Sequence, residues 1–215
     1  MKYNLYVITD QAIAGGLTHE EIAEQAIAGG ADVIQLRDKL CGCRELCQIG
    51  RALRAITIKT GTVFIVNDRL DVALACGADG VHLGQDDMRV DAARQIAPPG
   101  FIIGISVGTV DEAVRAEEQG ADYIAVSPIF STDSKKDAGQ GRGLDALREI
   151  HRSVSVPVIA IGGINLDNIP EVIRAGADGV AVISAVVGSR NITAAARNLS
   201  ERVSELKDTM RRGES

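Results

Sequence analysis

The chain has 215 residues, which is enough for one domain with a substantial hydrophobic core. Its formal net charge of −6 disfavours nonspecific binding to nucleic acid and electrostatic attachment to a membrane surface. No apolar run reaches the length of a membrane span and no signal peptide is evident, so we expect a cytoplasmic protein.

Buried strands are predicted by short apolar runs that are rich in Val and Ile. In chain order they cover residues 5–8, 33–36, 63–66, 80–83, 101–105, 123–126, 158–161 and 179–183. Four of these strands directly follow the tripeptide Gly-Ala-Asp, which begins at Gly30, Gly77, Gly120 and Gly176. Because glycine suits the left-handed position that ends a helix, each copy is interpreted as a helix end that leads into a strand.

The spacing of the tripeptides indicates a repeated unit. Successive copies are 47, 43 and 56 residues apart, which is too long for one strand–helix unit and fits two. Eight such units predict a single α/β domain over residues 1–215, a (βα)8 TIM barrel, with a doubly wound open sheet as the alternative. The first helix opens with a capping box formed by Thr18 and Glu21. The polar tail from about residue 207 to 215 is expected to fray.

Four cysteines are present, at Cys41, Cys43, Cys47 and Cys76. Their spacing matches no zinc or iron–sulfur pattern. Cys47 fits the buried face of a helix that begins near Gly42, where cysteine behaves as a small hydrophobe. A packing role is therefore favoured over a metal cluster.

Basic residues follow the second predicted strand. Gln35, Arg37 and Lys39 alternate along the chain, so in an extended segment their side chains point the same way, into the barrel mouth. Two cations and an amide on one face suit a polyanion, and arginine can hold phosphate through two hydrogen bonds. The alternative is a surface turn in which Asp38 neutralises its basic neighbours.

Carboxylates follow the third and fourth strands. Asn67 and Asp68 end the third strand, and Asp86 and Asp87 follow the fourth. Carboxylates on neighbouring strand ends can share one Mg²⁺, which prefers one or two carboxylates together with substrate phosphate oxygens. The alternative is helix N-capping, which needs only one carboxylate per helix.

The remaining strand ends also carry anion-binding groups. Ser106 follows the fifth strand, and residues 127–136 after the sixth contain several hydroxyls and two lysines. Residues 136–143 contain three glycines and are interpreted as a mobile flap or a surface loop without function. Gly162-Gly163 and Ser184 follow the seventh and eighth strands, where barrels frequently bind a monophosphate. Two anion sites predict two phosphorylated substrates, one of them a diphosphate.

The whole set of motifs resembles the thiamine-phosphate synthase family. The resemblance is carried by Gln35–Lys39, Asn67–Arg69, Gly80–Asp87, Thr132–Lys135, Ile161–Ile164 and Gly179–Ser184. It spans nearly the whole chain, from about Tyr6 to Ser184. It implies a (βα)8 barrel that joins a pyrimidine diphosphate to a thiazole phosphate and releases pyrophosphate.

The resemblance also implies a role for each matching residue. The pyrimidine diphosphate would be bound by Gln35, Leu36, Arg37, Asp38, Lys39, Asn67, Ser106 and Lys135. Four of these, Arg37, Lys39, Ser106 and Lys135, would serve catalysis by stabilising the leaving pyrophosphate. The thiazole phosphate would be bound by Thr132, Asp133, Ser134, Gly163, Ile183 and Ser184. Asp68 and Asp87 would hold Mg²⁺. The aminopyrimidine would stabilise a methylene cation that the thiazole nitrogen attacks, without a side-chain nucleophile or base.

Two departures from the family pattern are visible. Ser134 stands where the family often has threonine, and Ser127 precedes Pro128 where Gly-Pro is usual. The thiazole tautomerases share the barrel and carry a histidine at the position of Pro128, and they are the main alternative. A non-catalytic phosphate-binding barrel that regulates a partner is a third possibility.

The three histidines, His19, His82 and His151, are expected to lie away from the rim and to be dispensable for catalysis. The expected partners are two small phosphorylated substrates, without nucleic acid or membrane. The oligomeric state is left open.

Overall fold

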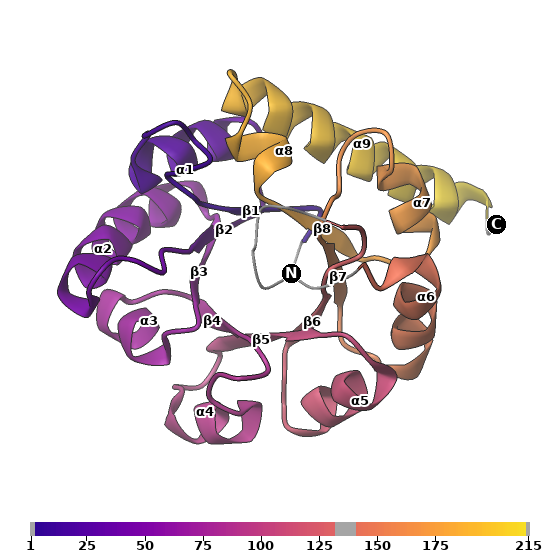
Figure 1. Cartoon of the computed structure of the whole chain (residues 1–215), viewed down its shortest axis with the longest axis horizontal. Helices are drawn as coiled ribbons and strands as arrows, with labels where there is room; N and C mark the ends of the chain where they lie inside the picture. Colours follow the sequence, from indigo (N-terminus) through magenta and orange to yellow (C-terminus); the bar gives the residue numbers. More distant parts are fainter. Residues whose placement is uncertain (1–2, 132–140, 214–215) are drawn as a thin grey trace.

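Eight parallel strands close into a barrel in chain order in the computed structural model, which describes residues 3–131 and 141–213 (Figure 1). The strands are β1 (Leu5–Ile8), β2 (Val33–Leu36), β3 (Val63–Asn67), β4 (Gly80–Leu83), β5 (Ile102–Val107), β6 (Tyr123–Val126), β7 (Val158–Ile161) and β8 (Gly179–Val182). Because β8 pairs with β1, the sheet has no free edge, and the open-sheet alternative is excluded. The (βα)8 barrel is confirmed.

Helices surround the barrel as an outer ring (Figure 1). They are α1 (His19–Ala28), α2 (Cys43–Thr60), α3 (Leu70–Cys76), α4 (Val90–Ile96), α5 (Val110–Glu118), α6 (Gly143–Ser153), α7 (Ile169–Arg174), α8 (Ser184–Val187) and α9 (Ile192–Gly213). The predicted capping box is present at α1, where the Thr18 hydroxyl accepts from the Glu21 N–H and the Glu21 carboxylate accepts from the Thr18 N–H. Two helices follow β8 where the repeat predicts one, because a short turn of helix precedes the long C-terminal one.

Five strands have the predicted bounds, and three differ at their ends. β3 continues to Asn67, and β8 ends at Val182. β5 extends to Val107 because Ser106 and Val107 still pair with Ala125 and Val126 of β6. A polar residue at the end of an apolar run therefore does not mark the end of the strand at this point.

The four Gly-Ala-Asp tripeptides end helices as predicted. Their glycines have φ values of 93° at Gly30, 70° at Gly77, 92° at Gly120 and 104° at Gly176. These values lie in the left-handed region that glycine adopts without a steric cost.

The aspartate of each tripeptide has a function that the spacing alone did not predict. Its backbone N–H donates to a carbonyl in the preceding strand, and its carboxylate accepts from the N–H of that same strand residue. The pairs are Asp32 with Leu5, Asp79 with Phe64, Asp122 with Ile103, and Asp178 with Val158. The carboxylate bonds measure 3.1, 2.8, 2.7 and 2.8 Å respectively. We call this contact the aspartate clasp; it fixes the N-terminal ends of β1, β3, β5 and β7.

The hydrophobic core has an inner and an outer part. The outer part fills the space between the strands and the helices. The inner part fills the barrel and consists of Tyr3, Tyr6, Ile8, Val33, Ile65, Ile102, Tyr123, Ala125, Ile159, Ile161, Ala181 and Ile183. All three tyrosines of the chain belong to this inner part.

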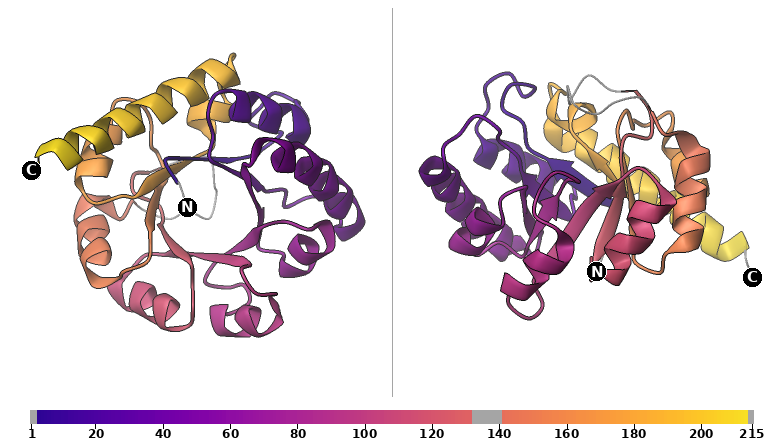
Figure 2. Two further views of the ribbon diagram at one scale, coloured as in Figure 1. Left: turned by 180° about the vertical axis from the view of Figure 1, so that it is seen from behind. Right: turned by 60° about the horizontal axis from the view of Figure 1, so that its bottom comes forward.

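Helix α9 lies along the outside of the barrel, against α1 and α7 (Figures 1 and 2). The tail expected to fray from residue 207 is instead helical to Gly213. Lys207 helps to hold it, because its ammonium donates to Asn4 Oδ1 at 2.7 Å and also to the Asp178 carbonyl. Among the described helices, none is both long enough and apolar enough to cross a membrane.

Candidate active site

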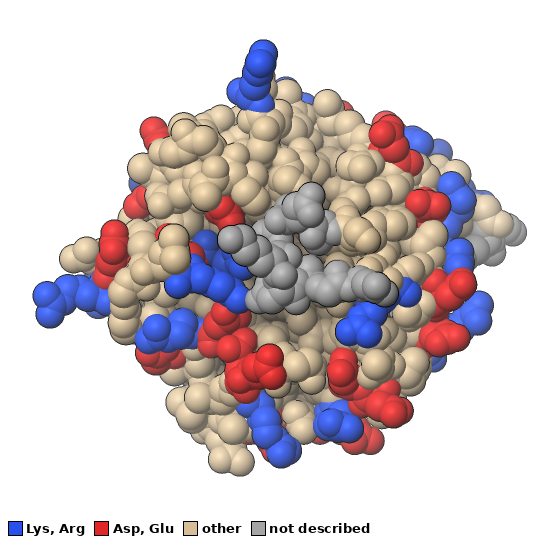
Figure 3. Space-filling model, in the orientation of Figure 1, with Lys and Arg blue, Asp and Glu red and all other residues tan. Residues whose placement is uncertain are grey.

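A polar cavity of about 310 Å³ opens at the C-terminal ends of β2 to β6. It is lined by Arg37, Lys39, Asn67, Asp68, His82, Gly84, Gln85, Asp86, Asp87, Ser106, Val107, Gly108, Glu112, Ser127 and Arg142. On the face shown in Figure 3, basic and acidic side chains lie next to one another beside the centre of the barrel. We call Arg37 and Lys39 the cationic part of the cavity lining, and Asp68, Asp86 and Asp87 with the adjacent Asn67 the acidic part.

Arg37 belongs to the cationic part and is held in place by Asp10. Its Nη1 lies 3.4 Å from Asp10 Oδ2, and both side chains are mostly buried. Its Nε atom is buried and has no hydrogen-bond partner among the described residues. The guanidinium can therefore donate from Nε to a further anion while Nη1 stays bound to Asp10. Lys39 lines the same cavity and is exposed.

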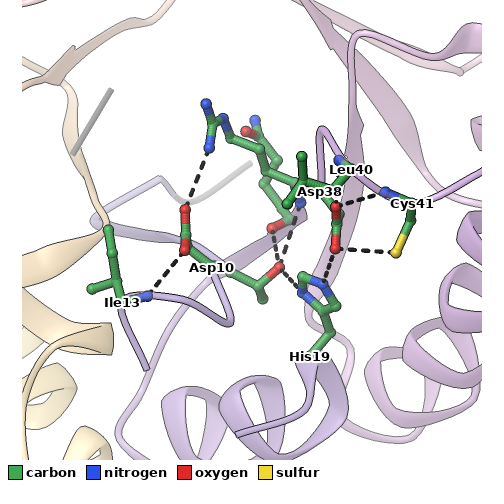
Figure 4. Close-up of polar contacts among 9 residues, drawn as sticks. Asp10, Ile13, His19, Asp38, Leu40 and Cys41 are labelled. Atoms are coloured by element: carbon green, nitrogen blue, oxygen red, sulfur yellow. Dashed lines mark hydrogen bonds and ion pairs between the residues drawn. The ribbon is translucent and has the colours of Figure 1, made fainter. Parts of the chain in front are cut away.

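Asp38 lies between these cations in sequence but faces the other way (Figure 4). Its Oδ1 accepts from the backbone N–H groups of Leu40 and Cys41 at 2.7 and 2.9 Å. Its Oδ2 lies 3.3 Å from Nε2 of His19, whose Nδ1 lies 2.7 Å from the Thr9 hydroxyl. Asp38 thus shapes the loop and does not line the cavity.

The acidity of Asp38 reflects these contacts. Partial burial alone would raise the pKa of its carboxyl group, but the hydrogen bonds from Cys41, Leu40 and His19 outweigh burial and lower the pKa to about 2. Asp38 is therefore ionised at neutral pH. Its described partners are not Arg37 or Lys39, so the alternative of a self-neutralised basic turn finds no support in these contacts.

Asp68 and Asp87 lie in the acidic part of the cavity, with Asn67 and Asp86. Asp68 has a φ of 62°, an uncommon conformation that aspartate tolerates better than most residues, and its N–H donates to the His82 carbonyl at 2.8 Å. Asp87 Oδ2 accepts from the Gly84 N–H at 2.7 Å.

None of these carboxylates caps a helix. The N-cap positions of α3 and α4 are Arg69 and Arg89, and neither helix has a side-chain capping bond. The capping alternative for Asp68, Asp86 and Asp87 is therefore wrong. Their position on the cavity wall needs another explanation.

Gln35 and Leu36 occupy two different environments, because adjacent strand residues point to opposite faces. Leu36 is buried in the outer core, away from the cavity. Gln35 is 1% exposed inside the barrel, where its Nε2 donates to the Tyr6 hydroxyl at 2.7 Å. Its Oε1 is buried without a hydrogen-bond partner among the described residues.

His82 is the main site residue that the sequence interpretation placed wrongly. It lines the cavity, and its Nε2 lies 2.9 Å from the Ser106 hydroxyl. The signal was present in the strand alternation, because Val81 and Leu83 face the outer core and His82 must then face inward. Glu112 and Arg142 also line the cavity without having been predicted, and Glu112 accepts from the Gly108 N–H at 2.6 Å.

The residues predicted for a second anion site lie at the ends of β7 and β8, apart from the cavity lining. Gly163 has a φ of 64°, and its carbonyl accepts from Asn168 Nδ2 at 2.8 Å. Ile183 is buried in the inner core, and Ser184 begins α8. Thr132, Asp133, Ser134 and Lys135 lie outside the described residues, as does most of the predicted flap.

A family model, curated relatives and a solved structure at 45% identity point to the same family. The family model described as thiamine monophosphate synthase matches residues 5–186. The thiamine-phosphate synthase of Methanoregula boonei is 64% identical over 211 residues, covering 98% of each chain. That of Methanocella arvoryzae is 60% identical over 207 residues, covering 96% of this chain and 98% of the relative. The solved structure of thiamine phosphate pyrophosphorylase from Pyrococcus furiosus is 45% identical, with a TM-score of 0.87 and coverage of 94% and 96%.

Proposed function

The chain belongs to the thiamine monophosphate synthase family, and on that premise we propose the reaction that it catalyses. It joins 4-amino-2-methyl-5-(diphosphooxymethyl)pyrimidine to a thiazole phosphate, which gives thiamine phosphate and pyrophosphate. Family membership supports formation of thiamine phosphate. The two substrates, the release of pyrophosphate and the need for Mg²⁺ are argued from the cavity.

The observation that carries this proposal is a pair of buried polar atoms without a hydrogen-bond partner among the described residues, one in β2 and one directly after it. Gln35 offers a buried acceptor, Oε1, and Arg37 offers a buried donor, Nε. Leaving such groups unpaired costs free energy, so each suits a ligand group of the opposite kind. An aminopyrimidine carries an amine that can donate to Gln35, and its diphosphate oxygens can accept from Arg37.

The carboxylates fit Mg²⁺ by their chemistry. Asp68 and Asp87 supply hard oxygen ligands beside a cationic wall, and Mg²⁺ is commonly bound by one or two carboxylates with phosphate oxygens and waters completing its shell. The described residues contain no group of three or more His, Cys, Asp or Glu side chains suited to a metal. Most of the ligands of the ion would therefore come from the substrate and from water. When bound, the ion would neutralise charge on the diphosphate.

The side chains of this chain act by positioning and electrostatics. Arg37, Lys39 and Ser106 would hold the departing pyrophosphate, together with Lys135 from outside the described residues. Fixed donors that face developing negative charge lower the barrier without a covalent bond between the protein and its substrate. The methylene carbon on the pyrimidine then carries positive charge, and the thiazole nitrogen attacks that carbon.

The thiazole phosphate would bind at the ends of β7 and β8. Gly163, Ile183 and Ser184 lie there, where barrels frequently bind a phosphate through backbone N–H groups. Thr132, Asp133 and Ser134 would complete this site.

Location in the cytoplasm and the absence of nucleic-acid and membrane partners stay predictions.

One experiment separates the three possible functions. Purified protein is incubated with both substrates and Mg²⁺, with and without EDTA, and thiamine phosphate and pyrophosphate are quantified. Formation of both products in equal amounts, abolished by EDTA, is the expected result. Isomerisation of a thiazole carboxylate phosphate without joining would indicate a tautomerase. Tight binding of both phosphates without turnover would indicate a regulatory barrel.

A further inference from the structure

A chain of polar side chains crosses the interior of the barrel. Gln35 Nε2 donates to the Tyr6 hydroxyl at 2.7 Å, which lies 3.0 Å from the Tyr123 hydroxyl. The Tyr123 hydroxyl lies 2.8 Å from His82 Nδ1, and His82 Nε2 lies 2.9 Å from Ser106 Oγ. We call these five residues the interior chain. It joins β1, β2, β4, β5 and β6, and its last two members, His82 and Ser106, line the cavity.

The fold makes specific room for this chain. Tyr123 is fully buried and faces Gly104 across the β5–β6 pairing. A Cβ atom at Gly104 would lie 2.4 Å from the Tyr123 hydroxyl oxygen and 2.0 Å from the ring, so no other residue fits there. The ring of Tyr123 also stacks on His82, with centroids 5.5 Å apart. Tyr123 therefore has one position, between Tyr6 and His82.

The chemistry of the groups sets the direction of the hydrogen bonds. The Gln35 amide nitrogen can only donate, so the Tyr6 oxygen accepts and the Tyr6 hydrogen is directed to Tyr123. Tyr123 then donates to His82 Nδ1, which must lack a hydrogen. Burial raises the pKa of both phenols, which keeps their hydrogens in place.

The direction continues through the imidazole. A neutral His82 that accepts at Nδ1 carries its hydrogen on Nε2 and donates it to Ser106 Oγ. The Ser106 hydrogen is then not used inside the chain. Ser106 lines the cavity, and among the described residues its hydroxyl has no second partner.

We propose that the interior chain fixes the Ser106 hydroxyl as a hydrogen-bond donor into the cavity, and that Tyr123 and His82 are positioning residues for Ser106. The proposal rests on the proposed function, in which Ser106 donates to the diphosphate. If Tyr123 does not donate to His82 Nδ1, the Ser106 hydroxyl can turn and donate to the imidazole instead. An acceptor lone pair would then face the anion.

The first test measures the direction of the hydrogen bonds in the interior chain and does not depend on turnover. Long-range ¹H–¹⁵N NMR of the ligand-free protein distinguishes the two imidazole tautomers. The protein has three histidines, and the signals of His82 are assigned by their loss in His82→Asn. We expect the Nε2–H tautomer at His82. The Nδ1–H tautomer would reverse the direction and overturn the proposal.

The second test asks whether the chain acts through Ser106. Tyr123→Phe removes one hydroxyl and keeps the ring, and we expect it to lower kcat/KM for the pyrimidine diphosphate about three- to tenfold. Tyr3→Phe is the matched control, because Tyr3 packs on Tyr123 with centroids 5.4 Å apart but lies outside the interior chain. We expect less than about a twofold change for this control.

A double-mutant cycle completes the argument. In a Ser106→Ala background, Tyr123→Phe should lose most of its effect, since no hydroxyl remains to be oriented. An equal effect in both backgrounds, or normal turnover by Ser106→Ala alone, overturns the proposal. If the wild-type protein forms no thiamine phosphate, the proposed function fails, while the NMR result still decides the direction of the chain.

Discussion

His19 and Asp38 join helix α1 to the loop that carries Arg37 and Lys39, with His19 Nε2 3.3 Å from Asp38 Oδ2 (Figure 4). The imidazole is 1% exposed and also contacts Thr9, whose hydroxyl donates to the Gln35 carbonyl at 3.2 Å. The pair therefore braces the loop on the cationic side of the cavity from behind, without reaching the cavity itself.

We predict that His19→Asn raises the KM for the pyrimidine diphosphate about three- to tenfold and changes kcat less, because a loosened loop presents Arg37 and Lys39 less often in the binding geometry. Steady-state kinetics with each substrate varied in turn measures this. His151→Asn, on the outer side of α6, is the control and should be neutral. An equal rise in KM for both substrates would contradict a local role for the brace.

The low pKa of Asp38 gives a prediction about acid stability. Its carboxyl pKa is about 2 in the folded protein, below the value of about 3.9 expected for an unfolded chain. A lowered folded-state pKa contributes stability that is present above about pH 4 and lost as the pH falls toward 2. Asp38→Asn should therefore lower Tm at neutral pH, and the difference from wild type should shrink below pH 4. A difference that stays constant down to pH 2 would show that the effect is not electrostatic.

Asp68 and Asp87 allow a test of the metal site with little effect on the fold. Asn tolerates the φ of 62° at Asp68, and an Asn oxygen at position 87 can still accept from the Gly84 N–H. We predict that Asp68→Asn and Asp87→Asn each weaken Mg²⁺ binding on the order of tenfold or more, with a matching loss of turnover at limiting Mg²⁺.

Calorimetric titration of Mg²⁺ in the presence of inorganic pyrophosphate measures binding apart from turnover. Asp86→Asn is the matched control, since Asp86 lines the same cavity but is exposed and is not among the proposed ligands. Normal Mg²⁺ affinity in both test variants would remove the metal assignment.

The aspartate clasp gives a prediction about stability. Asp178→Ala leaves the N–H of Val158 without its side-chain acceptor at 2.8 Å, and we expect a loss of about 1–3 kcal/mol in the free energy of unfolding. Urea denaturation of this variant measures the loss. Asp91→Ala is the control, because Asp91 pairs on the surface with an Arg89 side chain that is 72% exposed. Such exposed pairs contribute little to stability, so we expect a much smaller loss in this control. Equal losses in the two variants would show that the clasp has no special effect.

The sequence was sufficient for the barrel because its repeat encodes local geometry. A glycine that ends a helix and an apolar run that follows it are both visible in the chain, as at Gly77 and Val81. The clasp was not predictable in the same way, because Asp79 and its partner Phe64 are brought together only when β3 and β4 lie side by side.

The candidate site could be predicted in part. The rim position of Asp68 and Asp87 follows from strand order alone, since the C-terminal ends of parallel strands meet at one face. The turning of Asp38 toward His19 depends on a loop contact between two βα units, which no spacing rule describes. The prediction that His82 lies within its strand and away from the rim is half right, because it does lie in β4 but the strand alternation turns its side chain inward, where it lines the cavity.

Gly163 tests the division of the site between two substrates. A Cβ atom there would lie 2.8 Å from Phe130 Cβ and 2.9 Å from the Ser131 carbonyl oxygen, and φ is 64°. We predict that Gly163→Ala lowers Tm and raises the KM for the thiazole phosphate much more than that for the pyrimidine diphosphate, because the turn after β7 must move away from the strand end where the monophosphate would bind.

The matched control for Gly163→Ala is Gly61→Ala, which separates backbone strain from collision. Gly61 has a φ of 69°, and a Cβ atom added there would have no neighbouring atom within 4 Å. This control should lose about 1–2 kcal/mol from the left-handed conformation alone and keep both KM values. Melting curves and steady-state kinetics on both variants decide the matter. If Gly163→Ala raised both KM values equally while remaining folded, the monophosphate could not be bound by the turn after β7, and a single shared anion site would explain the kinetics better.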